Sequence, residues 1–225
     1  GRLWWAGGDK IWGSVSDGFS SFDASVEGDS GPISATIGFG PVDTIQWILP
    51  GQRLMLGSEG AELSCSSNSL DEPLTPSNFN IKAASTQGSG GVSAVKVDND
   101  GIFVQRGGTR AFQLQFNDGR LDYDVRDLTA LVPEIGQPQI VRMAVQRQPD
   151  TRVHFVRSDG TVALLIFDKT EEIICWCEDE STGASGDVED VVILPGAEGS
   201  DEDRVYYVVK RTINGSTVRF VEKLA

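Results

Sequence analysis

The side chains that could carry out chemistry are few in this sequence. It holds one histidine, His154, and three cysteines. A serine hydrolase needs a nucleophile elbow and a partner base, but no Gly-x-Ser-x-Gly motif occurs and His154 stands alone in an apolar strand pattern. We therefore predict no catalytic residue, no cofactor and no enzymatic activity, and we expect His154 to be a structural or surface residue.

Two of the cysteines, Cys175 and Cys177, flank Trp176, so their thiols share one face of an expected strand and the indole takes the other face. A structural zinc site needs four ligands, and the third cysteine and the histidine lack the paired spacing of such sites. The odd number of cysteines argues against a disulfide framework and fits synthesis in a reducing compartment. We expect buried, apolar-like thiols, with Trp176 and Trp47 mostly buried as well.

Acidic residues gather near the C-terminus. Ten of them lie between Glu178 and Asp203, with no lysine or arginine among them. Such a run is usually a solvated surface, but it could also hold a cation or meet a basic partner. If a calcium ion binds there, Asp187, Glu189 and Asp190 are the expected ligands.

Composition excludes some classes of partner. The net charge of −14 disfavours nucleic acid, because phosphate binding needs a basic face. No apolar run approaches the ~20 residues of a membrane-spanning helix. The chain opens with Gly1-Arg2-Leu3 and runs straight into Trp4-Trp5. From this opening we expect no signal peptide, and we expect the chain to be part of a longer protein.

The elements that would position these residues recur at an even spacing. Apolar runs open at Ile45, Val95, Val141 and Val191, at intervals of 50, 46 and 50 residues. Repeats of about 40–50 residues, each with several short strands, are typical of β-propeller blades. We predict an all-β, propeller-like fold in one domain over residues 1–225, with four or five small antiparallel sheets arranged radially.

The third repeat is the clearest. Asp159-Gly160 marks one of its hairpin turns, since Asp-Gly pairs accept the positive φ that tight turns need. Its expected strands are Ile140–Val145, Arg152–Arg157, Thr161–Phe167 and Glu172–Cys177.

Two expectations concern the rest of the chain. Apolar residues at helical spacing predict one short helix over Asp127–Ile135, capped by Asp127. Leu3–Ala6 and Lys10–Ser14 predict an N-terminal hairpin. Because the fourth repeat has three strands where the third has four, we expect the hairpin to join or flank the last sheet, which Leu3–Ala6 could complete.

Several strings resemble proteins of one family. They are Arg2-Leu-Trp-Trp-Ala-Gly, Lys10-Ile-Trp-Gly-Ser, Asp127-Leu-Thr, Ile140-Val-Arg-Met-Ala, Val156-Arg-Ser-Asp-Gly-Thr, Val188-Glu-Asp-Val-Val-Ile-Leu-Pro-Gly and Val208-Val-Lys-Arg-Thr-Ile-Asn-Gly-Ser-Thr-Val-Arg-Phe-Val-Glu. The family is that of bacteriophage and prophage tail proteins related to the tail nozzle of short-tailed phages.

This resemblance implies a non-enzymatic structural or assembly domain of a virion, cut from a longer tail protein. It implies other tail proteins as partners, and self-association into a ring in the parent protein. It also implies a place in the virion tail after synthesis in the bacterial host cytoplasm. The family carries no active-site residues onto this sequence.

The alternative is a carbohydrate- or receptor-binding propeller, with glycan hydrolysis as a further option. A hydrolase would need a pair of carboxylates converging in one cleft. The feature that separates the two hypotheses is whether acidic side chains and exposed tryptophans share a cleft.

Overall fold

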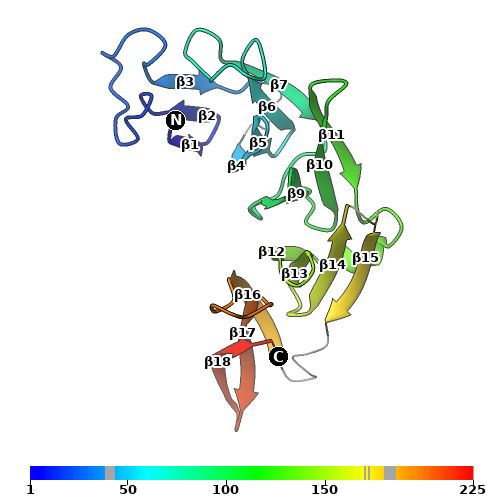
Figure 1. The fold of residues 1–225 in the computed structure, drawn as a ribbon. Helices are drawn as coiled ribbons and strands as arrows, with labels where there is room; N and C mark the ends of the chain where they lie inside the picture. The colour runs from blue at the N-terminus through cyan, green and yellow to red at the C-terminus, as the bar shows by residue number, and fades with distance from the viewer. Residues whose placement is uncertain (39–43, 170, 172, 180–185, 225) are drawn as a thin grey trace. The chain divides into compact units, whose positions relative to one another are not determined.

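A computed structural model describes residues 1–225 apart from 39–43, 170, 172, 180–185 and 225. In this part the chain forms strands β1 to β18 and one helix, the 3₁₀ turn η1 (Pro133–Gly136). The strands make five small antiparallel sheets, each built from consecutive strands (Figure 1). The predicted all-β class and the number of sheets are confirmed. Among the described residues, no helix is long and apolar enough to span a bilayer.

The chain divides into two compact units, and each is described by itself. The first unit holds residues 1–101 and 113–126, and the second holds residues 102–112 and 127–225. The division runs through the third sheet, whose order is β11-β10-β9-β8. Its strands are β8 (Val95–Val97), β9 (Asp100–Val104), β10 (Ala111–Asn117) and β11 (Asp122–Asp127).

The first unit contains two complete sheets. One is β1 (Trp4–Gly7), β2 (Lys10–Gly13) and β3 (Ile33–Thr36), and the other is β4 (Ile45–Pro50), β5 (Leu54–Ser58), β6 (Glu62–Ser66) and β7 (Asn80–Ser85). Ile11, Leu56 and Leu63 lie fully buried in one apolar cluster of this unit. Trp47 is 5 % exposed, as expected.

The N-terminal hairpin is confirmed, but its predicted partner is wrong. In the described structure β1 pairs with β2 alone, and β2 pairs on its other side with β3, where Trp12 lies opposite Ser34. Leu3–Ala6 therefore does not complete the last sheet. The physical reason is local: alternating Ile33-Ser34-Ala35-Thr36 supplies a third strand close in sequence, which the preceding Ser- and Gly-rich loop concealed.

Arg2 fixes the long loop between β2 and β3. Its guanidinium donates to the carbonyl oxygens of Ser14 at 2.5 Å, Gly31 at 2.6 Å, Asp29 at 2.6 Å and Leu74 at 3.1 Å. Burial lowers the pKa of Arg2. One side chain thus ties two loops to the start of the chain, since a guanidinium presents several donors in a fixed geometry.

The predicted helix over Asp127–Ile135 is wrong in its extent. Asp127 ends β11, and its carboxylate accepts hydrogen bonds from the backbone and hydroxyl of Thr129 at 2.8 and 2.7 Å, which closes a turn. Only η1 is helical, and it begins at Pro133, which can supply no backbone N–H. Leu131 is 96 % exposed, so the apolar stripe is not a buried helix face.

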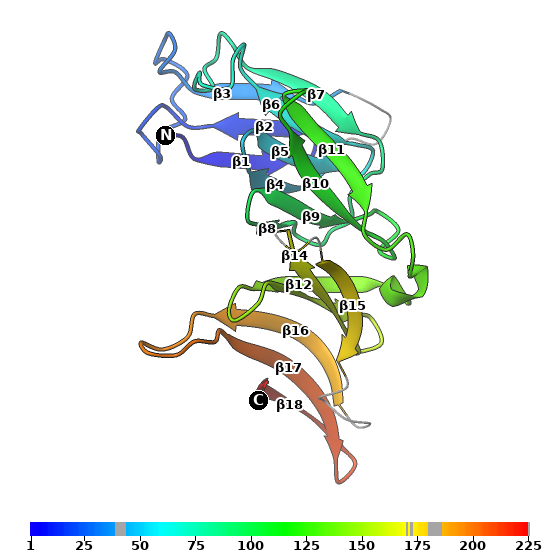
Figure 2. The ribbon, with the colours of Figure 1, turned by 45° about the vertical axis from the view of Figure 1, so that its right-hand side comes forward.

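The second unit contains the other two sheets. They are β12 (Ile140–Gln146), β13 (Arg152–Arg157), β14 (Val162–Asp168) and β15 (Ile173–Asp179), and then β16 (Gly186–Leu194), β17 (Arg204–Ile213) and β18 (Ser216–Lys223). In Figure 2, β16 lies beside β12, and these two strands are in contact. Val156 and Val162 of one sheet share an apolar cluster with Val188, Val191 and Val209 of the other.

The expected burial of the paired thiols is wrong. Cys175 and Cys177 are exposed, while Trp176 between them points inward, with its ring centroid 5.0 Å from that of Phe155. The indole is half-buried and donates a hydrogen bond of 2.8 Å to the carbonyl of Leu128. The face of β15 that carries Trp176 therefore packs against Phe155 and the Leu128 carbonyl, and the face that carries the two thiols is exposed.

Candidate functional site

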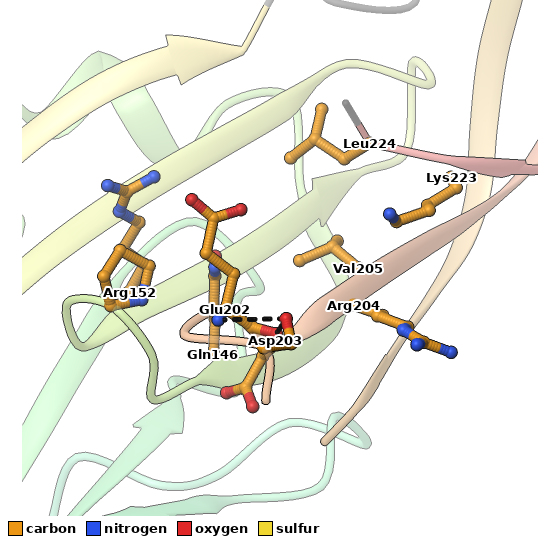
Figure 3. A pocket seen from close by; sticks show the side chains of 10 residues that line it. Gln146, Arg152, Glu202, Asp203, Arg204, Val205, Lys223 and Leu224 are labelled. Atoms are coloured by element: carbon orange, nitrogen blue, oxygen red, sulfur yellow. Dashed lines mark hydrogen bonds between the residues drawn. The ribbon is translucent and has the colours of Figure 1, made fainter. Parts of the chain in front are cut away.

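A polar pocket of about 290 Å³ lies in the second unit. It forms where the turn between β12 and β13 approaches the start of β17 and the end of β18 (Figure 3). The residues of its wall that matter for its chemistry are Gln146, Arg152, Glu202, Asp203 and Lys223.

Asp203 holds the two sides of this pocket together. Its Oδ2 accepts hydrogen bonds from the backbone N–H groups of Arg147 at 2.7 Å and Gln148 at 3.1 Å. In return, the backbone N–H of Asp203 donates to the carbonyl of Gln148 at 3.2 Å. This carboxylate is thus occupied in shaping the pocket, because two charge-assisted bonds fix one of its oxygens.

The remaining charged groups leave donors and an acceptor available. Arg152 donates from Nη2 to Asp150 at 3.0 Å, but its Nε is buried with no hydrogen-bond partner. Within the described residues, no ion pair involves Glu202 or Lys223. In Figure 3, Arg204 points away from Arg152 and Glu202, so it contributes little charge to the pocket.

Behind the pocket wall lies a buried chain of polar side chains. His154 is fully buried, with Nε2 3.1 Å from Oε1 of Gln146 and Nδ1 2.7 Å from the hydroxyl of Tyr207. The same hydroxyl lies 3.1 Å from Oδ2 of Asp179. Burial lowers the pKa of His154 to about 4, although the charge of Asp179 acts in the opposite direction. Burial also raises the pKa of Tyr207, and the nearby Asp179 raises it further.

His154 is therefore structural, as expected, but the network around it was not foreseen. Its partners lie 8 and 53 positions away in sequence, and no local pattern links them. The only sequence signal is the polar Gln146 at the end of an apolar strand.

The three proposed calcium ligands do not converge. Each carboxylate instead pairs with a cation on another strand: Asp187 with Lys210 at 3.3 Å, Glu189 with Arg219 at 2.6 Å, and Asp190 with Arg142 at 3.6 Å. No group of three or more His, Cys, Asp or Glu side chains in the described part of the chain could hold a metal ion. The acidic run has no basic residue of its own, so its neutralising partners come from other strands.

A second cavity, of about 400 Å³, lies in the first unit and is mainly apolar. Its wall includes Trp12, Phe22, Val26 and Ile33, and it contains no carboxylate. The polar pocket contains carboxylates and no tryptophan. Neither cavity therefore brings acidic side chains and an exposed tryptophan together, and that condition for a hydrolase cleft is not met by these two.

No family model and no curated protein match this chain. Solved structures do. One is an auxiliary nutrient binding protein from Bacteroides thetaiotaomicron, at 9 % identity and a TM-score of 0.48, with 97 % of this chain and 54 % of that chain covered. Another is a protein of the same organism named "Putative phosphatase", at 12 % identity and a TM-score of 0.53, with 97 % of this chain and 56 % of that chain covered. The likeness is one of fold.

The chain thus spans about half the length of the structures it matches. The comparisons contradict the resemblance to phage tail proteins: no family model and no curated protein of that kind matches the chain, and the structural neighbour with a TM-score of 0.53 is a Bacteroides protein of another description. The expected virion role, tail partners and tail location rested on that resemblance and lose their basis. Strings such as Val208–Glu222 are an ordinary hairpin around Asn214-Gly215, so they specify strands and a turn rather than a virion role.

Proposed function

We propose that this chain is a carbohydrate-binding module and that the pocket of Arg152, Glu202 and Lys223 is its ligand site. The proposal follows the second of the two hypotheses drawn from the sequence. Sharing of a fold with proteins of other descriptions does not specify a ligand, so the support comes from the pocket itself.

The observation that carries the proposal is the mixture of charges in the pocket wall. Arg152 and Lys223 supply donors to it, and Glu202 makes no ion pair within the described residues. A sugar hydroxyl is both a donor and an acceptor, so neighbouring hydroxyls of one neutral ligand can satisfy a guanidinium and a carboxylate together. A phosphate would meet the negative charge of Glu202, and a cation would meet Arg152 and Lys223.

The size of the pocket agrees with a small ligand. Its volume of about 290 Å³ is close to the lower end of the ~300–1,000 Å³ range of small-molecule sites. A monosaccharide, or the end of an oligosaccharide, is the class of ligand that we propose.

We propose binding without turnover. Hydrolysis of a glycoside requires two carboxyl groups with separate roles. Of the two acids in this pocket, Asp203 is held in place by two backbone hydrogen bonds to its Oδ2, so Glu202 is the carboxylate without a positioning role. Phosphatase activity, which the printed name of one structural neighbour suggests, has less support because Glu202 would repel the substrate.

The test is binding of the full chain to an array of neutral mono- and oligosaccharides, followed by calorimetric titration of the best one. Glu202→Gln is expected to weaken binding by about tenfold, since one charge-assisted bond is worth ~1.5–3 kcal/mol. Glu198→Gln, an exposed acid of the same segment, is the matched control and should leave affinity unchanged. Binding only to phosphorylated sugars, or equal affinity for both variants, would overturn the proposal.

A further inference from the structure

The chain of hydrogen bonds behind the pocket has a direction that is fixed at one end. Nε2 of Gln146 donates to the carbonyl of Gln148 at 2.9 Å, which turns Oε1 of Gln146 toward His154. A carbonyl oxygen can only accept, so this contact is a hydrogen bond when Nε2 of His154 carries a hydrogen.

The other end of the chain is short of hydrogens. Three contacts must be filled: Gln146 to His154, His154 to Tyr207, and Tyr207 to Asp179. A neutral imidazole has one N–H, a phenol has one O–H, and an ionised carboxylate has none. Only two hydrogens are therefore available for three contacts. In one of the contacts, a lone pair on each atom faces the other with no hydrogen between them.

We propose that these four side chains form a proton-binding site that takes up one proton as a unit when the pH falls and thereby fixes Gln146 in the pocket wall. The proton comes from solvent, and no other covalent bond is formed or broken. On His154 it gives an imidazolium beside the Asp179 carboxylate. On Asp179 it gives a carboxyl group that donates to Tyr207, which then donates to His154. Both placements fill all three contacts, and both keep His154 Nε2–H bonded to Gln146.

Without this proton, two tautomers of His154 compete. With hydrogen on Nε2, Gln146 is held and one contact of Tyr207 fails. With hydrogen on Nδ1, Tyr207 can donate to Asp179, but the Gln146 oxygen then faces a lone pair and is released. The buried network thus couples the proton to the orientation of Gln146, which lines the polar pocket.

The groups packed around His154 are those that can influence its protonation. Asp179 on β15 and Tyr207 on β17 belong to the site, and Cys177 lies two residues before Asp179. Arg152, on the same strand as His154, opposes protonation of the ring. From β14, Leu164 lies opposite His154, and β16 contributes the apolar Val188 and Val191 to the neighbouring core.

The chain has one histidine, so its ring gives a single set of long-range ¹H–¹⁵N signals in the intact protein. The test follows these signals against pH in the wild type and in Asp179→Asn. The asparagine amide can supply the missing hydrogen to Tyr207 but not the negative charge. We expect the midpoint of the His154 titration to fall by at least one pH unit.

Asp201→Asn removes an exposed carboxylate and should leave the His154 midpoint unchanged. An unchanged His154 midpoint in Asp179→Asn overturns the proposal.

A second measurement rests on the proposed carbohydrate function. The ratio of wild-type to Asp179→Asn affinity for the best sugar should rise toward one as the pH falls from 7, because Gln146 becomes fixed in the wild type. Taking this ratio cancels the effects of pH on the pocket that both proteins share. If no sugar binds while the NMR shift is present, the carbohydrate function fails and the proton site stands. If sugar binds but the His154 midpoint does not move, the proton site fails and the function stands.

Discussion

The hydroxyl of Tyr207 lies 2.7 Å from Nδ1 of His154, across 53 positions of sequence. Tyr207 belongs to β17 and His154 to β13, so this one contact joins the two sheets of the second unit through their buried polar atoms. Around it the core is made largely of valine. A polar bond in such surroundings is costly to break, because the freed group cannot reach water.

Tyr207→Phe is therefore expected to lower the free energy of unfolding by about 1–3 kcal/mol, the usual cost of leaving a buried polar partner unsatisfied. Urea unfolding at pH 7 measures this loss. Tyr206→Phe on the same strand is the control, because no hydrogen bond from its hydroxyl occurs within the described residues. Equal stability of the two variants would contradict a structural role for the Tyr207 hydroxyl.

The stability of the protein should fall between pH 6.5 and pH 4. The pKa of His154 drops from 6.5 to about 4 on folding, so in this window the unfolded state binds more protons than the folded state. The stabilisation that results from the lowered pKa of His154 is fully present above pH 6.5. It is on the order of 3 kcal/mol, at 1.36 kcal/mol per pKa unit, and it is lost across this window. The difference between the free energies of unfolding of the wild type and of His154→Gln, measured against pH, gives the contribution of His154. A difference that does not change with pH would show that His154 is protonated alike in both states.

The burial of Glu62 gives the stability of the protein the opposite dependence on pH. Glu62 is fully buried, its Oε1 accepts a bond of 2.8 Å from Ser89, and its Oε2 has no partner. Burial raises its pKa above the ordinary value of 4.5, so the stability present below pH 4.5 is lost as the pH rises through the folded value. Glu62→Gln should thus stabilise the protein by about 1 kcal/mol at pH 7, where the charge is removed, and by less at pH 4. Thermal melts at both values test this, with exposed Glu72→Gln as the control.

Thiol labelling should distinguish two cysteines from the third. Cys175 and Cys177 are exposed and are expected to react quickly with a thiol reagent in the native protein. Cys65 is 1 % exposed, and burial raises its pKa to about 12, so it should react only after unfolding. Mass spectrometry would show two labels before urea and three after it. If only one label were added to the native protein, one of the two thiols on β15 would have to be covered and not exposed to solvent.

The indole N–H of Trp176 should contribute separately from its ring. Trp176→Phe keeps an aromatic ring near Phe155 but removes the 2.8 Å bond to the Leu128 carbonyl. We expect a loss of about 1 kcal/mol from that bond, besides any loss of packing. Trp5→Phe, at a tryptophan that is 59 % exposed, should be close to neutral in the same unfolding experiment.

Strand positions could be predicted because they depend on alternation and turn residues that lie within a few positions of each other. The sheets open at Ile45, Val95, Ile140 and Gly186, close to the starts expected from apolar runs. The prediction of a helix over Asp127–Ile135 was wrong, because the spacing of apolar residues does not show whether they are buried. Leu131 is exposed.

The pocket and the buried network could not be predicted for a different reason. Tyr207 meets His154 over 53 positions and Asp179 over 28, so these partners come together only when the sheets pack. The same holds for the paired cysteines: alternation placed both thiols on one face, but which face met solvent was decided by the packing of Trp176 against Phe155 on another strand.

The four carbonyl oxygens that Arg2 gathers have a practical meaning for protein engineering. Ser14 and Gly31 are anchored at the two ends of an exposed loop, and Leu74 belongs to a different loop. After a protease cut between Gly18 and Gly28, Ser14 and Gly31 on the two sides of the cut would still be bonded to the same guanidinium. The pieces should therefore separate on a denaturing gel but migrate together in gel filtration. A foreign peptide inserted at that point would be displayed from a loop whose two ends are held together by Arg2 and not by the inserted residues.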